Sequence, residues 1–175
     1  MKGTKRYARV VAGVLLCLLA VLLLTGQQCS ESSVLSFQPG VATMAPGETV
    51  TMNVYLQRAG SHYPAGIQFS LTYDPVVVTV ESVEEGSLFL GSCSTTFFRG
   101  GTIDNEGGMV TGVVCVVTEP GCSVSSSGTV ATITFTAGTE PGYSILQLSG
   151  VRLGNVAGNV LSCAGSTGKV EITAP

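Results

Sequence analysis

The sequence predicts an all-β fold, a β-sandwich of the jelly-roll type, from three observations. Several short segments alternate apolar and polar residues with a period of two, which is the pattern of strands with one buried face. Turn sequences separate these segments, and residues 27–175 hold all seven prolines and all but three of the 23 glycines. No apolar period of 3.6 residues in this region is long enough for a helix. Short strands between dense turns are typical of sandwiches and jelly rolls.

Seven segments carry the strand pattern. They are residues 50–57, 67–73, 76–80, 109–118, 129–137, 143–153 and 169–173. The turns between strands contain Ala45-Pro46-Gly47-Glu48, Glu84-Glu85-Gly86, Asp104-Asn105-Glu106-Gly107-Gly108, Glu119-Pro120-Gly121 and Glu140-Pro141-Gly142. The segment that begins at Val76 follows Asp74-Pro75, where a proline ends strand pairing or marks a sheet edge. A hairpin is expected to turn near Asp104.

The first 26 residues have the anatomy of an export signal. A basic stretch over residues 1–9 precedes the uninterrupted apolar run Val10–Leu24. As a helix this run would reach about 23 Å, short of a hydrocarbon core about 30 Å thick, which favours cleavage over an uncleaved membrane anchor. A lipoprotein anchored through Cys29 is a third option, although Gly26-Gln27-Gln28 departs from the lipobox pattern. All three place the folded part outside the cytoplasm, with residues 27–33 as a short tether and 34–175 as the domain.

The cysteines agree with export. Cys93, Cys115, Cys122 and Cys163 lie inside the domain, and in an exported chain they are expected to form disulfides. A hairpin turning near Asp104 would place Cys93 opposite Cys115, which leaves Cys122 to pair with Cys163. A zinc site is the alternative, but no Cys-x-x-Cys or Cys/His cluster of the usual spacing occurs. Cys29 is left odd and is free, lipidated or close to the cleavage point.

Charge and residue counts exclude several functions. Eleven acids and four bases give residues 27–175 a net charge of −7, which would repel a phosphate backbone, so nucleic-acid binding is excluded. A Ser-His-Asp or Cys-His arrangement would have to use the single histidine, His62, which is expected to lie exposed in a loop. Asp74 is interpreted as a turn residue, and the acids at 84–85 as solvated loop charges in preference to a glycosidase pair. The acids at 104–106 are interpreted as a polar hairpin tip in preference to a calcium loop.

An ordered set of short motifs resembles the cohesin domain of bacterial cellulosomes and its relatives outside them, over residues 34–173. The motifs are Phe37-Gln38-Pro39-Gly40, Ala45-Pro46-Gly47-Glu48-Thr49-Val50, Phe69-Ser70-Leu71-Thr72-Tyr73-Asp74-Pro75, Val83-Glu84-Glu85-Gly86-Ser87-Leu88, Ser127-Gly128-Thr129-Val130-Ala131-Thr132-Ile133-Thr134-Phe135, Pro141-Gly142-Tyr143, Gly158-Asn159-Val160 and Gly168-Lys169-Val170. The resemblance implies a jelly roll of about nine strands without catalytic activity. It also implies a dockerin as partner, a small calcium-stabilised helical module on another secreted protein. No cofactor or metal is then expected on this chain, and any calcium belongs to the dockerin.

The resemblance places the partner on the face that includes the strand before Tyr73. The expected contacts are Gln68, Ser70 and Thr72, helped by Phe98 and Arg99 from the hairpin over residues 95–111. In a strand one of the two adjacent phenylalanines faces out, and an exposed aromatic beside arginine suits an interface anchor. The chain departs from the family in its four domain cysteines. It also has Gly66 and Gln68 where well-known cellulosomal cohesins carry Asn and Asp.

The leading hypothesis is therefore an exported, non-catalytic interaction module that binds a dockerin-bearing secreted protein at the cell surface, in an assembly linked to polysaccharide degradation. The first alternative is a carbohydrate-binding module, since such modules share the sandwich architecture. Binding of crystalline polysaccharide needs a planar row of exposed aromatics, and the chain has no Trp and five Tyr. The second alternative is a structural sandwich of an envelope assembly. An enzyme ranks last, and contact with a membrane is expected only through the N-terminal segment.

Overall fold

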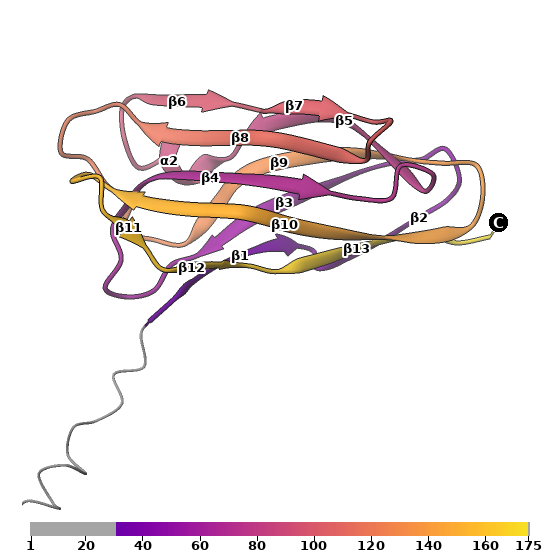
Figure 1. The fold of residues 1–175 in the computed structure, drawn as a ribbon, viewed down its shortest axis with the longest axis horizontal. Helices are drawn as coiled ribbons and strands as arrows, with labels where there is room; N and C mark the ends of the chain where they lie inside the picture. The colour runs from indigo at the N-terminus through magenta and orange to yellow at the C-terminus, as the bar shows by residue number, and fades with distance from the viewer. Residues whose placement is uncertain (1–30, 175) are drawn as a thin grey trace, which may run out of the picture. The chain divides into compact units, whose positions relative to one another are not determined.

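In the computed structural model, which describes residues 31–174, thirteen strands form two β-sheets (Figure 1). The all-β sandwich predicted from the sequence is confirmed. The expected export signal, most of the tether and Cys29 lie outside the described residues. Within residues 31–174, no helix is both long enough and apolar enough to cross a membrane.

The smaller sheet has five strands in the order β12-β1-β3-β9-β5. Its strands are β1 (Ser33–Gln38), β3 (Thr49–Gln57), β5 (Val78–Glu85), β9 (Gly128–Ala137) and β12 (Cys163–Gly165). The pairing is antiparallel except between β1 and β12, which run parallel.

The larger sheet has eight strands and lies in front in Figure 1. Its main order is β2-β13-β10-β4-β8-β6, with β11 paired to β10 and β7 paired to β8. Its strands are β2 (Val41–Met44), β4 (Pro64–Thr72), β6 (Thr96–Arg99), β7 (Thr102–Asp104), β8 (Met109–Val117), β10 (Gly142–Asn155), β11 (Val160–Leu161) and β13 (Thr167–Ile172). Strands β2 and β13 run parallel.

The core lies between the sheets and follows from the alternation in the sequence. In β4, for example, Ile67, Phe69 and Leu71 are buried while Gln68 and Thr72 face solvent. The largest fully buried side chains are Phe69, Phe89 and Phe135. Burial of each such ring stabilises the fold by about 1.5–3 kcal/mol. Because alternate residues of a strand point to opposite faces, the apolar residues determine which face of each strand points inward.

All seven expected strand segments contain strands, but two details differ. The count of about nine was too low, because one hairpin arm is divided into β6 and β7 and because β11 and β12 are short additional strands. Val76 was wrongly expected to begin a strand. It is 85% exposed in the turn after Pro75, and β5 begins at Val78.

A single helical turn, α2 (Ser87–Leu90), follows β5 and was not expected from the sequence. It buries Leu88 and Phe89, and four residues are too few to show a helical period. Gly86 precedes it in close contact with β9, where an added Cβ would lie 2.3 Å from the Thr129 carbonyl oxygen. Only glycine fits there, because no side chain can occupy that space.

The expected hairpin over 95–111 is present, and it turns later than expected. Asp104 pairs with Met109 and Arg99 pairs with Val114, so facing residues are spaced symmetrically about the bond between residues 106 and 107. The turn is secured by Asn105, whose Oδ1 accepts hydrogen bonds from the Tyr73 hydroxyl at 2.6 Å and from the Val80 N–H at 2.9 Å.

This register makes the expected disulfide pairing wrong. Cys115 lies opposite Phe98, and Cys93 lies beyond the end of β6, where the loop after β8 returns. Cys93 forms a disulfide with Cys122, while Cys115 and Cys163 are free thiols. The expectation failed because it placed the turn about two residues too early.

Candidate interaction face

The outward side of β10, β4, β8 and β6 carries the predicted site. Strand register arranges its side chains in rows that run across the sheet. One row contains Arg99, Val114, Gln68 and Arg152, and the next contains Phe97, Val116, Gly66 and Gly154. Because cross-strand neighbours share a face, residues from four separate segments form one continuous surface.

Strand β4 places its three predicted residues on this surface. Gln68 and Thr72 are exposed. Ser70 is half-buried, and its hydroxyl oxygen accepts a hydrogen bond from the Gly112 N–H at 3.3 Å. Gln68 and Thr72 are therefore free to contact a partner, whereas Ser70 also supports the irregular pairing between β4 and β8.

The hairpin residues are only partly as expected. Arg99 is exposed on the outward face, but Phe98 packs against the core, and expecting it to be the exposed aromatic was wrong. Its neighbour Phe97 is the outward aromatic, with 54% of its surface exposed. The register is the cause: Phe98 lies opposite Cys115, which is buried, so Phe97 takes the outward position.

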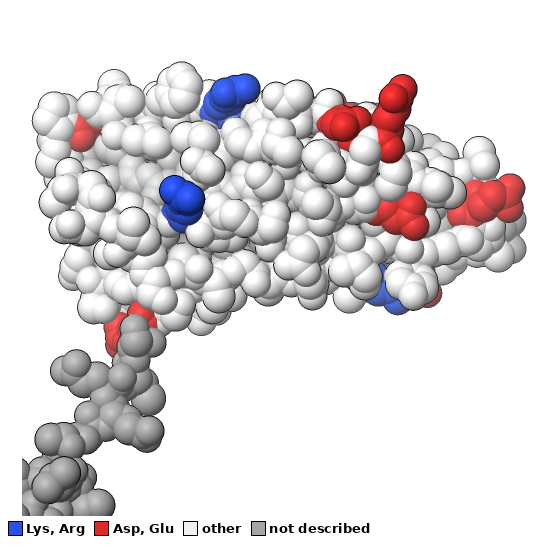
Figure 2. All heavy atoms as spheres, viewed as in Figure 1, with Lys and Arg blue, Asp and Glu red and all other residues white. Residues whose placement is uncertain are grey.

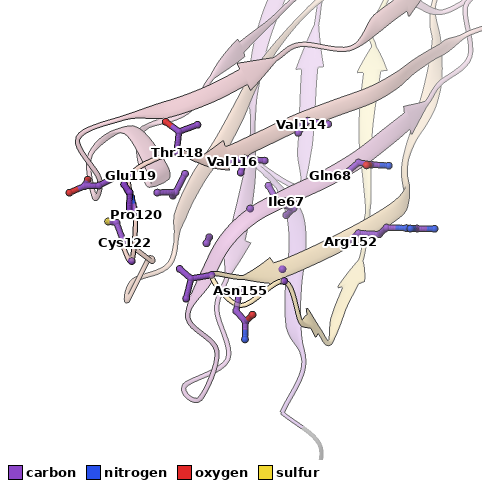
Figure 3. Close-up of a pocket in the computed structure, with 17 residues that line it drawn as sticks. Ile67, Gln68, Val114, Val116, Thr118, Glu119, Pro120, Cys122, Arg152 and Asn155 are labelled. Carbon is purple, nitrogen blue, oxygen red and sulfur yellow. The ribbon is translucent and has the colours of Figure 1, made fainter.

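A depression of about 500 Å³ lies at the end of this face where β4 begins and where β8 and β10 end (Figure 3). Gly66, Val116 and Gly154 form its floor beside Gln68 and Arg152. A Cβ added at Gly66 would lie 3.3 Å from the Val116 side chain and 3.4 Å from the Cys115 carbonyl oxygen, which is tight. Glycine at this position therefore keeps the floor low. In the sequence it was recognised only as a departure from a family pattern.

Two loops form the rim of the depression; the turn at 119–121 and the motif at 158–160 were recognised in the sequence, but their place beside this face was not. One contains residues 118–122, held by the Cys93–Cys122 disulfide and by the Ser94 N–H, which donates to the Glu119 carboxylate at 2.6 Å. The other contains residues 155–158, where Asn155 Oδ1 accepts the Ala157 N–H at 3.0 Å. Both loops are bonded to the sheet or to themselves, so the depression is a preformed feature.

Charge is distributed unevenly over this face (Figure 2). Two separate basic groups lie over the left half of the view, whereas acidic groups gather towards the right end. The acids of the 104–106 hairpin tip lie at the end of β7 that is farther from Arg99 along the hairpin. The right end of this face is therefore predominantly acidic, and the left half carries two basic groups together with a few acidic ones.

The single histidine belongs to a structural contact. Correcting the expectation of an exposed residue, His62 is half-buried, and its Nδ1 lies 2.9 Å from the Ser33 hydroxyl. The same hydroxyl accepts the Ala59 N–H at 3.0 Å, and Ser33 is fully buried. A buried hydroxyl already bonded to the backbone positions the loop after β3 and has no open side for a substrate.

Two of the candidate acids are bonded in turns, whereas the pair at 84–85 was wrongly expected in a loop and forms the end of strand β5. Asp74 Oδ1 accepts the Val76 N–H at 3.0 Å, and Asp104 Oδ1 accepts the Glu106 and Gly107 N–H groups at 3.1 and 2.9 Å. The interpretations as a turn residue and a hairpin tip are confirmed.

One cluster of the described residues has the donor types of a metal site, namely Cys93, Glu119 and Cys122. Its two sulfur atoms are joined as a disulfide, so they have no thiolate to offer a metal.

The two free thiols are held in the protonated form. Burial raises the pKa of Cys115 to about 12, assisted by the Glu85 carboxylate, which lies 3.4 Å from its sulfur. Burial likewise raises the pKa of Cys163 to about 11. Neither thiol has the lowered pKa of a nucleophile or of a metal ligand.

Comparison with known proteins gives a consistent family match. The family model described as "Cohesin domain" matches residues 35–172. No curated protein matches the chain. Among solved structures, a type I cohesin–dockerin complex from Clostridium thermocellum is similar, with a TM-score of 0.66 and 16% identity over 81% of this chain and 99% of that chain.

Two further structures have the same fold. A non-cellulosomal cohesin from the archaeon Archaeoglobus fulgidus matches with a TM-score of 0.60 and 20% identity, over 83% of this chain and 93% of that chain. A cohesin from Clostridium acetobutylicum, determined in solution, matches with a TM-score of 0.62 and 20% identity, over 82% of this chain and 92% of that chain. At these identities the likeness establishes the fold.

Proposed function

The chain belongs to the cohesin domain family, and from that premise we propose that it is a protein-binding module whose partner is a dockerin. Cohesin domains are non-catalytic interaction modules. The proposed docking surface is the outward side of β10, β4, β8 and β6, hereafter the docking face.

The observation that carries this proposal is the composition of the docking face. It combines an exposed aromatic, Phe97, with the exposed valine Val116, the flat glycine floor and the polar reach of Gln68. Aromatic and arginine residues concentrate at the centres of protein interfaces, and exposed apolar groups grouped on one face indicate an interaction site.

A dockerin is proposed because similar structures are of complexes whose names describe cohesins bound to dockerins. Calcium is then required by the partner and not by this chain. The dockerin is expected on secreted proteins that degrade polysaccharides, so that this chain recruits them into an assembly.

Export to the cell surface is part of the same proposal. The Cys93–Cys122 disulfide supports it, because disulfides persist in oxidising compartments outside the cytoplasm. Mass spectrometry of the mature chain from fractionated cells tests it. An intact cytoplasmic chain with reduced Cys93 and Cys122 would contradict export, and the mass of the N-terminal peptide separates cleavage from anchoring and lipidation.

Calorimetric titration of residues 31–175 with a panel of dockerins from the same organism tests dockerin binding. Residues Glu31–Pro175 form one compact unit with its own hydrophobic core, so this fragment is expected to fold by itself. We expect binding with calcium that is lost with a chelator. Phe97→Ala should raise Kd at least about tenfold. Val76→Ala, which removes an exposed side chain from a turn outside the docking face, should leave Kd unchanged.

Failure of every dockerin to bind would contradict the proposal and direct attention to polysaccharide. That alternative has weak support in the structure. The exposed aromatics of residues 31–174 are Tyr63 in the loop after β3, Phe97 in β6 and Tyr143 at the start of β10. They lie on separate elements and form no row.

A further inference from the structure

Two arginines on the docking face have no partner within the described residues. Residues 31–174 contain four basic side chains. Arg58 donates to backbone carbonyls of its own loop and lies 5.2 Å from the Tyr63 ring centre. Lys169 forms an ion pair with Glu171 at 2.7 Å. Arg99 and Arg152 are exposed and make neither an ion pair nor a side-chain hydrogen bond in residues 31–174. They are two free cations in a domain whose net charge is −7.

The fold places these cations on opposite sides of the docking face. Arg99 is on β6 and Arg152 is on β10, and β8 and β4 lie between them with Val114 and Gln68 in the same row. Three strand spacings separate the two arginine backbones by about 14 Å. In Figure 3, Gln68 and Arg152 project from neighbouring strands to the same side.

An α-helix with its side chains is about 10–12 Å wide, which matches the space between the two arginines. A helix lying along β4 and β8 would cover Val114 and Gln68 and have one guanidinium against each flank. An extended peptide would gain little here, because the broad side of a sheet offers no free backbone groups for strand addition.

We propose that the docking face is specific for a partner helix that carries carboxylates along both flanks, one flank paired with Arg99 and the other with Arg152. This inference rests on the proposed function and specifies the chemistry of the partner. Docking would remove water from both guanidiniums, which is unfavourable unless carboxylates replace it, so a neutral or basic helix is rejected. Arginine suits this role because its fork can bond a carboxylate through two parallel hydrogen bonds.

The test uses a display library of the dockerin from the Clostridium thermocellum complex, with its helix-surface positions varied among Asp, Asn, Lys and Gln. Residues 31–175 are used to select binders, in parallel with the double variant Arg99→Glu/Arg152→Glu. We expect the unmodified domain to enrich Asp on both flanks of one helix and the double variant to enrich Lys there. For a clone selected by the unmodified domain, Arg99→Gln and Arg152→Gln should each raise Kd at least about tenfold.

Matched controls separate recognition from folding. Lys169→Gln removes a positive charge from the same sheet outside the depression and should leave Kd unchanged. The melting temperatures of Arg99→Gln and Arg152→Gln should equal that of the unmodified domain, because neither side chain has a bond to lose within the described residues.

The possible failures are distinguishable. Binders without acidic enrichment, or natural dockerins that bind the double arginine-to-glutamine variant equally well, would overturn the inference and leave dockerin binding intact. Absence of binders from both the library and the natural panel would remove the proposed function together with the inference. A further outcome is retention of the unmodified domain on polygalacturonate without binding of a dockerin. If the variant Arg99→Gln/Arg152→Gln then lost this retention, the arginines would be assigned to an acidic polysaccharide and the inference would be overturned.

Discussion

Cys115 and Cys163 are free thiols whose burial raises their pKa values above the ordinary value of 9.0. In the folded chain both stay protonated to about pH 11. In the unfolded chain both ionise near pH 9. Between these values the unfolded state binds fewer protons than the folded state, so the free energy of unfolding falls as pH rises.

We therefore expect residues 31–175 to be about 2 kcal/mol less stable at pH 10.5 than at pH 8.5, because two thiols ionise on unfolding. Solvent screening at the half-buried Cys163 makes its share of this loss smaller than that of Cys115. Urea titrations over this range measure it. The double variant Cys115→Ala/Cys163→Ala loses packing but should have a distinctly flatter pH dependence. An equal slope in both proteins would show that the thiols do not titrate as described.

Individual residues also show what the sequence could not determine. Alternation predicted that one of Phe97 and Phe98 faces outward, but the choice between them depends on which residues β6 meets on β8. That register depends on the position of the turn, and glycines at 100, 101, 107 and 108 allow the chain to turn at several places. The outward residues of β4 were predictable, because Ile67, Phe69 and Leu71 fix the phase of that strand.

At the scale of elements, the longer alternating strands were recovered from the sequence, while the short strands β1, β2, β11 and β12 and most connections were not. A strand has a local signal in the alternation of its residues, whereas the loop after β8 is positioned by distant contacts such as the Val124 N–H to the Pro64 carbonyl at 2.8 Å. The Cys93–Cys122 disulfide and the depression that it borders depend on this loop. They therefore remained hidden in the spacing of four cysteines, which allows three pairings.

Reduction of this disulfide should lower stability by about 3–4 kcal/mol, because it closes a loop with a sequence separation of 29 in the unfolded chain. Thermal melts with and without a reductant measure the effect, and Cys93→Ser/Cys122→Ser should reproduce the reduced value. The variant Cys163→Ala should keep its sensitivity to the reductant. Unfolded residues 31–175 should expose two reactive thiols, and a count of zero would favour the two disulfides expected from the sequence.

For the molecule as a whole, the two ends of the domain close the sandwich together. Strand β1 pairs with β12 in the smaller sheet, and β2 pairs with β13 in the larger sheet. The central pairs β3–β9 and β4–β10 also join segments that are far apart in the sequence. Folding is thus dominated by non-local contacts, and neither sheet is complete until the last strand is present.

Deletion of β13 tests this closure. Residues 31–166 would lack the buried side chains Val170 and Ile172 and would leave β2 and β10 without the strand that lies between them. We expect this fragment to show no cooperative unfolding transition by circular dichroism or calorimetry, because the lost burial and backbone pairing exceed the 5–15 kcal/mol that typically stabilises a domain once the exposed core side chains are included. Residues 31–173 are the matched control, since the shorter deletion preserves the bond from the Thr173 N–H to the Met44 carbonyl at 3.1 Å, and they should melt like residues 31–175. A cooperative transition of residues 31–166 within a few degrees of the control would mean that β2 and β10 are stable edges, and that the C-terminal strand covers a sandwich already complete without it.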